Sequence, residues 1–194
     1  MNIIMATGNL NKVRELKEML GGTDLNIITM KDAGIDVEIE ETGTTFEENA
    51  AIKAETIRDI TGETVIADDS GLEIDFLGGE PGIYSARYMG EDTPYEIKNA
   101  ALLKRLEGVP DEKRTARFIC AIAIAWPCGK TSIFRGVFEG RIAHEPAGGN
   151  GFGYDPIFYV PEKGCTAAEL DPECKNEISH RGKAMRLVVK ELKL

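Results

Sequence analysis

A short polar segment near the N-terminus has the residue types that bind phosphate. It reads Thr7-Gly8-Asn9-Leu10-Asn11-Lys12 and follows an apolar stretch over residues 2–6. The first N–H groups of a helix favour an anion, Gly8 lets the backbone approach a ligand, and Lys12 lies one turn inside on the face of Asn9. The same residues also suit an ordinary helix cap followed by an exposed lysine, so the segment alone leaves both interpretations open.

Two adjacent carboxylates, Asp68 and Asp69, end a second apolar stretch and precede Ser70 and Gly71. Like charges this close repel each other unless a cation stabilises them. Mg²⁺ sites use one or two protein carboxylates together with phosphates and water, which makes the pair a candidate metal site. Successive residues of a strand point to opposite faces, so the two need not share a role. The alternative is a solvated turn.

An acidic stretch precedes a helix and offers further carboxylates, namely Glu38, Glu40 and Glu41 with Glu47 and Glu48. Most of them suit partners of the helix dipole or a solvated surface. One of these five could be a second metal ligand, but the spacing alone does not indicate which.

The C-terminal third holds a glycine-rich loop over residues 147–155 that contains Phe152-Gly153-Tyr154-Asp155. An aromatic ring can stack on a nucleobase, and an Asp can accept hydrogen bonds from its N–H groups. The alternative is an ordinary turn beside a core Phe. Lys175, His180 and Arg181 follow near the start of the last helix, where their charge favours an anionic or keto-bearing ligand.

The elements that position these residues follow a mixed α/β pattern. Turn residues and hydrophobic spacing separate them, a Ser/Thr-x-x-Glu capping box in two registers begins at Thr44 and Thr45, and Thr93 suits the cap of a third helix. The patterns predict strands over residues 2–6, 25–30, 64–68, 71–76, 117–125 and 131–142, and helices over residues 10–20, 44–60, 93–107 and 179–192. Gly21-Gly22 is the expected end of the first helix. We find no repeat or linker, which predicts one domain over residues 1–194.

Composition excludes several classes of protein. The 194 residues carry 23 Lys and Arg against 33 Asp and Glu, a formal charge of −10, which argues against a broad nucleic-acid binder. The longest apolar run, residues 119–127, is too short to span a bilayer, and the N-terminus lacks a signal-peptide pattern. We therefore expect a cytoplasmic protein that binds neither nucleic acid nor membrane, with its four cysteines as free thiols.

Together the motifs resemble the inosine triphosphatase family, also called Ham1-like or XTP/dITP diphosphatases, which act on noncanonical purine nucleoside triphosphates. The resemblance covers nearly the whole chain. It rests on Thr7-Gly8-Asn9-x-x-Lys12, Glu40-Glu41-Thr42-Gly43-x-Thr45-Phe46-x-Glu48-Asn49-Ala50, Ala67-Asp68-Asp69-Ser70-Gly71-Leu72, Pro81-Gly82-x-Tyr84-Ser85-Ala86-Arg87, Gly151-Phe152-Gly153-Tyr154-Asp155-Pro156 and Ser179-His180-Arg181.

The resemblance implies an elongated α/β fold, a mixed sheet flanked by helices, with two lobes and an active-site cleft between them, in a homodimer. It implies Mg²⁺-dependent cleavage of ITP, dITP and XTP to the monophosphate and pyrophosphate. Carried over by motif, Asp69 resembles the general base, and Glu40 and Asp69 the metal-associated carboxylates. The substrate contacts it implies are Thr7, Gly8, Asn9, Leu10, Asn11, Lys12, Ser70, Phe152, Gly153, Tyr154, Asp155, Lys175, His180 and Arg181.

Hydrogen-bond polarity adds a hypothesis about selectivity. Hypoxanthine and xanthine carry an acceptor oxygen at purine position 6, where adenine carries a donor amine, and Arg181 can only donate. Arg181 would then discriminate against ATP but not against GTP, which shares the 6-keto group. Two other classes stay open: a nucleotide pyrophosphatase of the Maf-like group with another base preference, and a nucleotide-binding protein without catalysis.

Overall fold

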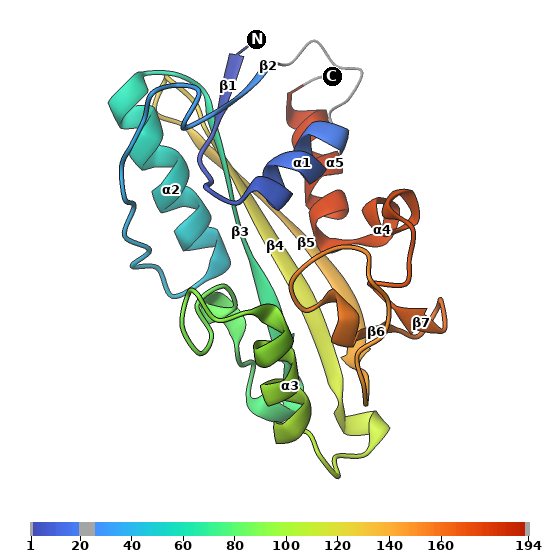
Figure 1. Ribbon diagram of the computed structural model, residues 1–194. Helices are drawn as coiled ribbons and strands as arrows, with labels where there is room; N and C mark the ends of the chain where they lie inside the picture. The colour runs from blue at the N-terminus through green and yellow to red at the C-terminus, as the bar shows by residue number, and fades with distance from the viewer. Residues whose placement is uncertain (1, 20–25, 193–194) are drawn as a thin grey trace. The chain divides into compact units, whose positions relative to one another are not determined.

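The computed structural model describes residues 2–19 and 26–192, in which seven strands form one mixed sheet and five α-helices accompany it (Figure 1). The strands are β1 (Asn2–Met5), β2 (Asn26–Thr29), β3 (Val65–Ile74), β4 (Thr115–Ala125), β5 (Thr131–Ile142), β6 (Phe158–Val160) and β7 (Cys165–Thr166), in the order β2-β1-β3-β4-β5-β6-β7. The helices are α1 (Leu10–Met19), α2 (Phe46–Thr61), α3 (Tyr95–Arg105), α4 (Pro172–Ile178) and α5 (His180–Glu191). β1 pairs in parallel with β2 and β3, whereas β6 pairs antiparallel with β5 and β7. The predicted α/β class with a mixed sheet is confirmed.

The chain divides into two compact units. Unit 1 comprises Met1–Asp69, Cys120–Gly136 and His180–Leu194, and unit 2 comprises Ser70–Ile119 and Val137–Ser179. The strands β3, β4 and β5 each contribute residues to both units. The single domain, and the two lobes with a cleft between them, stay predictions from the sequence.

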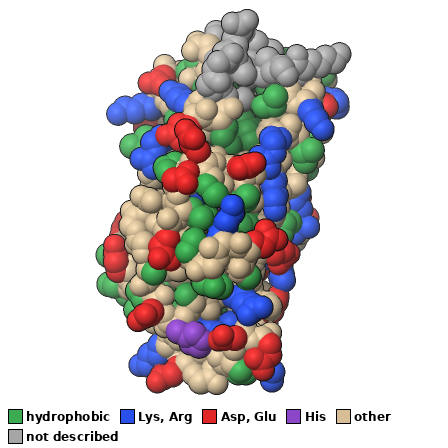
Figure 2. Space-filling view, turned by 90° about the vertical axis from the view of Figure 1, so that its right-hand side faces the viewer, with side chains coloured by type: hydrophobic (Ala, Val, Ile, Leu, Met, Phe, Trp, Pro, Cys, Tyr) green, Lys and Arg blue, Asp and Glu red, His purple; other side chains and the backbone are tan. Residues whose placement is uncertain are grey.

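The surface carries charges of both signs. On the face drawn in Figure 2, acidic and basic side chains are interspersed rather than gathered into one basic stripe. None of the helices in the described residues combines the length and apolar composition needed to cross a bilayer.

Unit 1 is layered, with helices on both sides of its strands. Figure 1 shows α2 on one side of β1 and β3, and α1 beside α5 on the other. The core on the α1 and α5 side consists of Ile3, Met5, Val13, Leu16, Ile66, Cys120, Ile122, Ile124, Ala184, Met185 and Val188. Because side chains alternate along a strand, the residues between these strand positions face α2, whose buried side is made of Phe46, Asn49, Ala50, Ala54 and Ile57.

The start of α2 follows the predicted capping signal. The hydroxyl of Thr45 accepts a hydrogen bond from Glu48 N at 3.1 Å, so Thr45 is the N-cap. The Glu48 carboxylate returns one residue earlier than in a standard capping box, accepting from Thr44 N at 2.6 Å. Gly62 ends the helix in the left-handed conformation with φ of 71°, which glycine adopts without steric cost. Of the two predicted registers, the fold uses the one that begins at Thr45.

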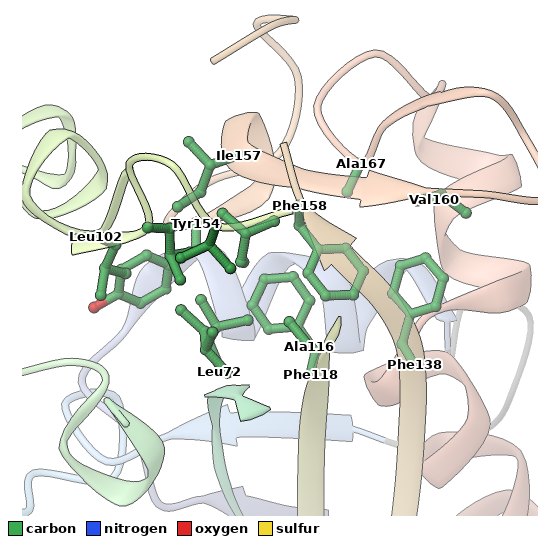
Figure 3. Close-up of a cluster of buried hydrophobic side chains, with 14 of the residues drawn as sticks. Leu72, Leu102, Ala116, Phe118, Phe138, Tyr154, Ile157, Phe158, Val160 and Ala167 are labelled. Atoms are coloured by element: carbon green, nitrogen blue, oxygen red, sulfur yellow. The ribbon is translucent and has the colours of Figure 1, made fainter. Parts of the chain in front are cut away.

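Unit 2 has a separate core in which aromatic rings pack closely. Figure 3 shows the rings of Phe118, Phe138 and Phe158 together, with Tyr154 lying toward Leu102 of α3. The Phe158 ring centroid lies 4.4 Å from that of Phe118 and 5.1 Å from that of Phe138. Contacts of this kind add about 0.5–1.5 kcal/mol to the free energy gained from burial.

Two predicted features differ in the structure. Residues 64–68 and 71–76 are not two strands, because β3 runs without a break from Val65 to Ile74 and buries the carboxylates in its middle. Thr93 does not cap α3: its hydroxyl donates to Met89 O at 2.8 Å, and the N-cap is Pro94, which supplies no side-chain hydrogen bond. Leu10, which the family motif implied as a substrate contact, is the first residue of α1 and is 78% exposed.

Some short elements of the structure could not be predicted from the sequence patterns. The helix α4 and the strands β6 and β7 were not predicted, because each is too short to show a clear period. The predicted helix end at Gly21-Gly22 and the predicted start of a strand at Leu25 lie outside the described residues. The strands β4 and β5 are neighbours in the sheet, and Trp126 N donates to Lys130 O across the turn between them at 2.9 Å.

Candidate active site

The segment between β1 and α1 is a helix cap with an open backbone. Asn9 Oδ1 accepts hydrogen bonds from Asn11 N at 3.0 Å and from Lys12 N at 3.3 Å, while Asn9 N donates to Thr7 Oγ1 at 3.2 Å. Gly8 is exposed, and a Cβ added there would meet nothing within 4 Å. The cap interpretation is confirmed for Asn9, and the exposed backbone at Gly8 leaves room for a ligand.

Lys12 is not the exposed lysine that the cap interpretation implied. Its side chain is 14% exposed and its Nζ lies 3.0 Å from Asp68 Oδ2, which has no exposed side-chain surface. Arg181 Nη2 lies 3.3 Å from the same oxygen, and Arg181 Nη1 also pairs with Glu15. Asp68 therefore joins cations from α1 and α5, elements far apart in the sequence.

Electrostatics keep Asp68 ionised. Burial by itself raises the pKa of a carboxyl group, but Lys12, Arg181 and Lys53 outweigh it and hold the pKa of Asp68 well below its usual range. Burial likewise lowers the pKa of Arg181, and the neighbouring Asp68 and Glu15 more than restore it. The negative charge of Asp68 is thus balanced by buried cations, and Asp68 is part of a buried ion-pair network.

Asp69 points to the opposite face of β3 and has different surroundings. Lys53 Nζ of α2 lies 3.3 Å from Asp69 Oδ1 and 2.7 Å from Glu41 Oε1. Asp69 is 6% exposed, and within the described residues its Oδ2 has no hydrogen-bond partner. Burial raises the pKa of Asp69 despite the attraction of Lys53 and Lys12. These cations therefore offset only part of the free-energy cost of burying the charged carboxylate.

The structure gives the neighbouring carboxylates Glu40 and Glu41 different surroundings, and Glu40 as a metal-associated carboxylate stays a prediction. Glu40 is exposed, whereas Glu41 is partly buried and is linked to Asp69 through Lys53. The loop has this register because the Asn49 side chain accepts from Gly43 N at 2.9 Å. A Cβ on Gly43 would lie 2.6 Å from that acceptor oxygen, Asn49 Oδ1, so only glycine fits.

These carboxylates fit a divalent cation that is shared with phosphate. Asp69 Oδ2 is a buried acceptor without a partner in the described residues, and Glu41 lies on the far side of the Lys53 ammonium. No group of three or more His, Cys, Asp or Glu side chains that could hold a metal occurs in the part of the chain that the structure describes. Mg²⁺, which takes one or two carboxylates plus phosphate and water, suits such a sparse set.

The start of α5 lies tightly against β5. A Cβ on Gly136 of β5 would lie 2.0 Å from His180 O and 2.7 Å from Ala184 N. His180 and Arg181 are 7% and 3% exposed. The predicted basic groups at this helix start are therefore buried, and Arg181 belongs to the Asp68 network.

The glycine-rich loop and Lys175 form a second cluster, within unit 2. Lys175 Nζ lies 2.7 Å from Asp155 Oδ2, which also accepts from Phe152 N at 2.8 Å. The same ammonium lies 5.3 Å from the centre of the Phe152 ring. Gly151 has φ of 72°, and a Cβ there would lie 2.2 Å from Asp155 Oδ2. The conformation of this turn therefore holds a carboxylate, an ammonium group and an aromatic ring close together.

Two residues in this part of the sequence differ in burial. Tyr154 is 3% exposed and belongs to the hydrophobic core, where its hydroxyl donates to Ser85 O at 2.7 Å. Phe152 is half-buried and is the ring of this loop that a ligand can reach. Ser70, also half-buried, directly follows Asp69 in β3.

Lys53 and Glu15 are site residues that the motifs did not indicate. Both lie on the buried side of a helix, Lys53 one turn from Ala50 and Ile57 and Glu15 beside Leu16. A charged residue within an apolar stripe is the signal that could have revealed them, because burial without a partner is costly.

Comparison with known proteins places the chain in a well-populated group. A model described as the Ham1 family matches residues 3–191. The chain is similar to a dITP/XTP pyrophosphatase of Listeria monocytogenes, with 52% identity over 98% of this chain and 94% of the relative, and to one of Bacillus licheniformis, with 54% identity over 95% and 94%. The solved Ham1 protein of Staphylococcus aureus is 44% identical with a TM-score of 0.90, covering 100% of this chain and 98% of that one. The HAM1 protein of Coxiella burnetii is also 44% identical with a TM-score of 0.91, over the same shares.

Proposed function

Because this chain belongs to the Ham1 family, we propose that it hydrolyses deaminated purine nucleoside triphosphates, namely ITP, dITP and XTP, to the monophosphate and pyrophosphate. The activity predicted from the motifs agrees with the names of relatives, dITP/XTP pyrophosphatases, that share about half of its residues over nearly the whole chain. The observation that carries the chemistry is Asp69, a buried carboxylate with a raised pKa and an oxygen that lacks a partner in the described residues.

Mg²⁺ is the proposed cofactor, held by Asp69 and Glu40, the carboxylates that the family motif implies. When bound, it supplies positive charge that offsets the negative charge of the phosphate oxygens. Lys53 lies between Asp69 and Glu41, so Glu41 is a further carboxylate close to this site. Glu40 is exposed and is therefore accessible to a cation.

Lys12 and the backbone of the α1 N-terminus are the proposed triphosphate contacts. Lys12 has three donors and uses Asp68 as an anchor at 3.0 Å, which limits its motion while leaving other donors for phosphate. Thr7, the exposed Gly8 and the capping Asn9 border the same helix end, where partial positive charge favours anions.

The proposed reaction is an attack of water on the α-phosphorus. A bond forms between the water oxygen and that phosphorus, the bridging bond to the β-phosphate breaks, and pyrophosphate leaves with the electron pair. Asp69 accepts the proton of the water. Since burial raises the pKa of Asp69, its carboxylate is a better base than a solvated Asp, and it becomes active as pH rises through that pKa.

The unit 2 cluster is the proposed nucleoside contact. The half-buried ring of Phe152 suits stacking on a base, and Lys175 with Asp155 offers a donor and an acceptor. Arg181 as the reader of the 6-keto oxygen stays a prediction, and its pairs with Glu15 and Asp68 must open or shift before it can donate to a base.

The test is pyrophosphate release from dITP, XTP, ITP, ATP and GTP, with and without Mg²⁺. We expect the first three to be cleaved, and only with Mg²⁺. Preference for another base would indicate activity of the Maf-like kind, and tight ITP binding without pyrophosphate release would indicate a binding protein. From the family resemblance we also propose a cytoplasmic homodimer that binds no nucleic acid, which light scattering, fractionation and a DNA-binding assay would check.

A further inference from the structure

One face of α3 reaches the nucleotide-binding loop, residues 151–155, although no motif includes this helix. Tyr95 and Asn99 lie four residues apart and so share a face. Asn99 Nδ2 donates to Gly153 O at 3.2 Å, and the Tyr95 and Tyr154 rings meet edge to face with centroids 5.1 Å apart. The loop is thus held at two consecutive residues by one helix.

Lys98, on the same face, extends these contacts to a second loop. It is 1% exposed, and its Nζ donates to Ala86 O at 2.6 Å while lying 4.9 Å from the centre of the Tyr95 ring. The Tyr154 hydroxyl donates to the adjacent carbonyl, Ser85 O, at 2.7 Å. Both loops are therefore fastened to α3 and to each other by side chains that are buried in the protein.

Asn99 carries a free-energy cost that a role in stability alone does not explain. It is 5% exposed, and its Oδ1 finds no hydrogen-bond partner in the residues that the structure describes. An acceptor buried without a partner is unfavourable, whereas an apolar side chain of similar size carries no such penalty. The useful part of Asn99 is its donor, which holds the peptide carbonyl of Gly153.

That carbonyl lies inside the turn that organises the unit 2 cluster. Gly153 adopts φ of 70° between Phe152 and Asp155. In the same turn Phe152 N donates to Asp155 Oδ2 at 2.8 Å, and that oxygen also binds Lys175 at 2.7 Å. A rotation of the Gly153 peptide would move the residues on both sides of it.

We propose that Asn99 is a positioning residue that sets the specificity and affinity of the nucleoside half of the site by holding Gly153. The proposal rests on the function proposed above, in which this loop binds the nucleoside and Lys12 binds phosphate. It predicts an effect on ligands that carry the nucleoside and none on pyrophosphate alone.

The experiment compares Asn99→Leu, which keeps the branched shape and removes the donor, with Asn99→Ala as a second variant. Leu103→Ala is the matched control, because Leu103 packs from α3 against the same core and its side chain has no hydrogen-bonding group. Calorimetry with IMP and with pyrophosphate, and dITP kinetics, are measured for each. We expect IMP affinity and kcat/KM to fall by about threefold to tenfold, the effect of one hydrogen bond, with kcat nearly unchanged.

An equal loss of IMP and pyrophosphate affinity, or a loss matched by Leu103→Ala, would mean that Asn99 only supports the fold. No change in either affinity would also overturn the proposal. Hydrogen exchange of the Phe152 amide in the free protein separates this outcome from a failure of the proposed function. If the parent protein fails to bind IMP, faster exchange at Phe152 in both Asn99 variants, but not in the control, would still support positioning, and unchanged exchange would refute it.

Discussion

Replacing Asp69 by Asn tests the chemistry of this carboxylate and its effect on stability in one protein. Asn has nearly the same shape, but it cannot take a proton from water at neutral pH. The change also removes the attraction to Lys53, whose Nζ lies 3.3 Å from Asp69 Oδ1. The loss of general-base action alone is expected to lower kcat by roughly 10²–10⁴-fold.

Although Asp69→Asn is expected to lower activity, we expect it to increase the stability of the protein. Burial raises the pKa of Asp69 above its ordinary value of 3.8, so between the unfolded and the folded pKa the folded state binds more protons. Stability then falls as pH rises through this window, and at pH 7 the ionised carboxylate still destabilises the fold. Asp69→Asn should therefore unfold at a higher temperature than the parent protein when Mg²⁺ is absent.

Asp68→Asn is the matched control, since it makes the same change one residue earlier on the other face of β3. The pKa of Asp68 is lowered, because Lys12 and Arg181 outweigh the effect of burial. A lowered pKa means that the charge stabilises the fold above the unfolded pKa, a contribution that is lost as pH falls through the folded pKa. Removing this partner of two buried cations is expected to lower the free energy of unfolding by about 3–5 kcal/mol.

Thermal unfolding at pH 7, with and without Mg²⁺, and pyrophosphate release from ITP check both variants. Mg²⁺ at a hundredfold excess over its Kd should stabilise the parent by about 2.7 kcal/mol and Asp69→Asn far less. Activity of Asp69→Asn within threefold of the parent would refute its role as the base. If both variants unfolded at a lower temperature than the parent, this would refute the conclusion that burial destabilises the charge of Asp69 while the charge of Asp68, on the other face of β3, stabilises the fold.

Three further substitutions test the surrounding contacts. Lys12→Ala should reduce ITP hydrolysis more than IMP affinity, and equal losses measured by kinetics and calorimetry would point to the fold or the base instead. Arg181→Ala leaves the carboxylates of Glu15 and Asp68 without this partner and should lower the free energy of unfolding, measured in urea, by about 3–5 kcal/mol. A smaller ratio of kcat/KM for ITP to kcat/KM for ATP, without that loss of stability, would show instead that Arg181 contacts the base. Gly136→Ala places a Cβ 2.0 Å from His180 O and should destabilise the protein by about 1–3 kcal/mol, whereas an unchanged melting temperature would contradict the close packing of β5 and α5.

Local signals predicted the elements that have strong local causes. The capping residues around Thr45 and the glycine at position 62 bound α2 as the sequence indicates, because these interactions join neighbours in the chain. The break predicted between residues 68 and 71 does not occur, since cations from other elements stabilise carboxylates inside a continuous strand. A pattern confined to a few residues has no information about those distant partners.

The sequence by itself determined that Asp68 and Asp69 would face opposite ways, because alternation along a strand is a property of the backbone. It also determined the turn chemistry of the loop that ends at Asp155. Only the tertiary structure decided which cation serves each carboxylate: Lys12 and Arg181 for Asp68, and Lys53 for Asp69. That choice depends on which helix packs on which face of the sheet.

The same reason explains why Glu41, and not Glu40, forms the ion pair with Lys53. Both follow one another in an acidic stretch that local patterns treat alike, and only one of them contacts Lys53, on a helix that begins after the stretch ends. Helix packing is set by the burial of apolar surface over the whole unit, and the free energy of a charge pair then depends on the distance and burial that this packing imposes. The sequence thus specifies the chemical groups, and the long-range packing specifies which of them meet.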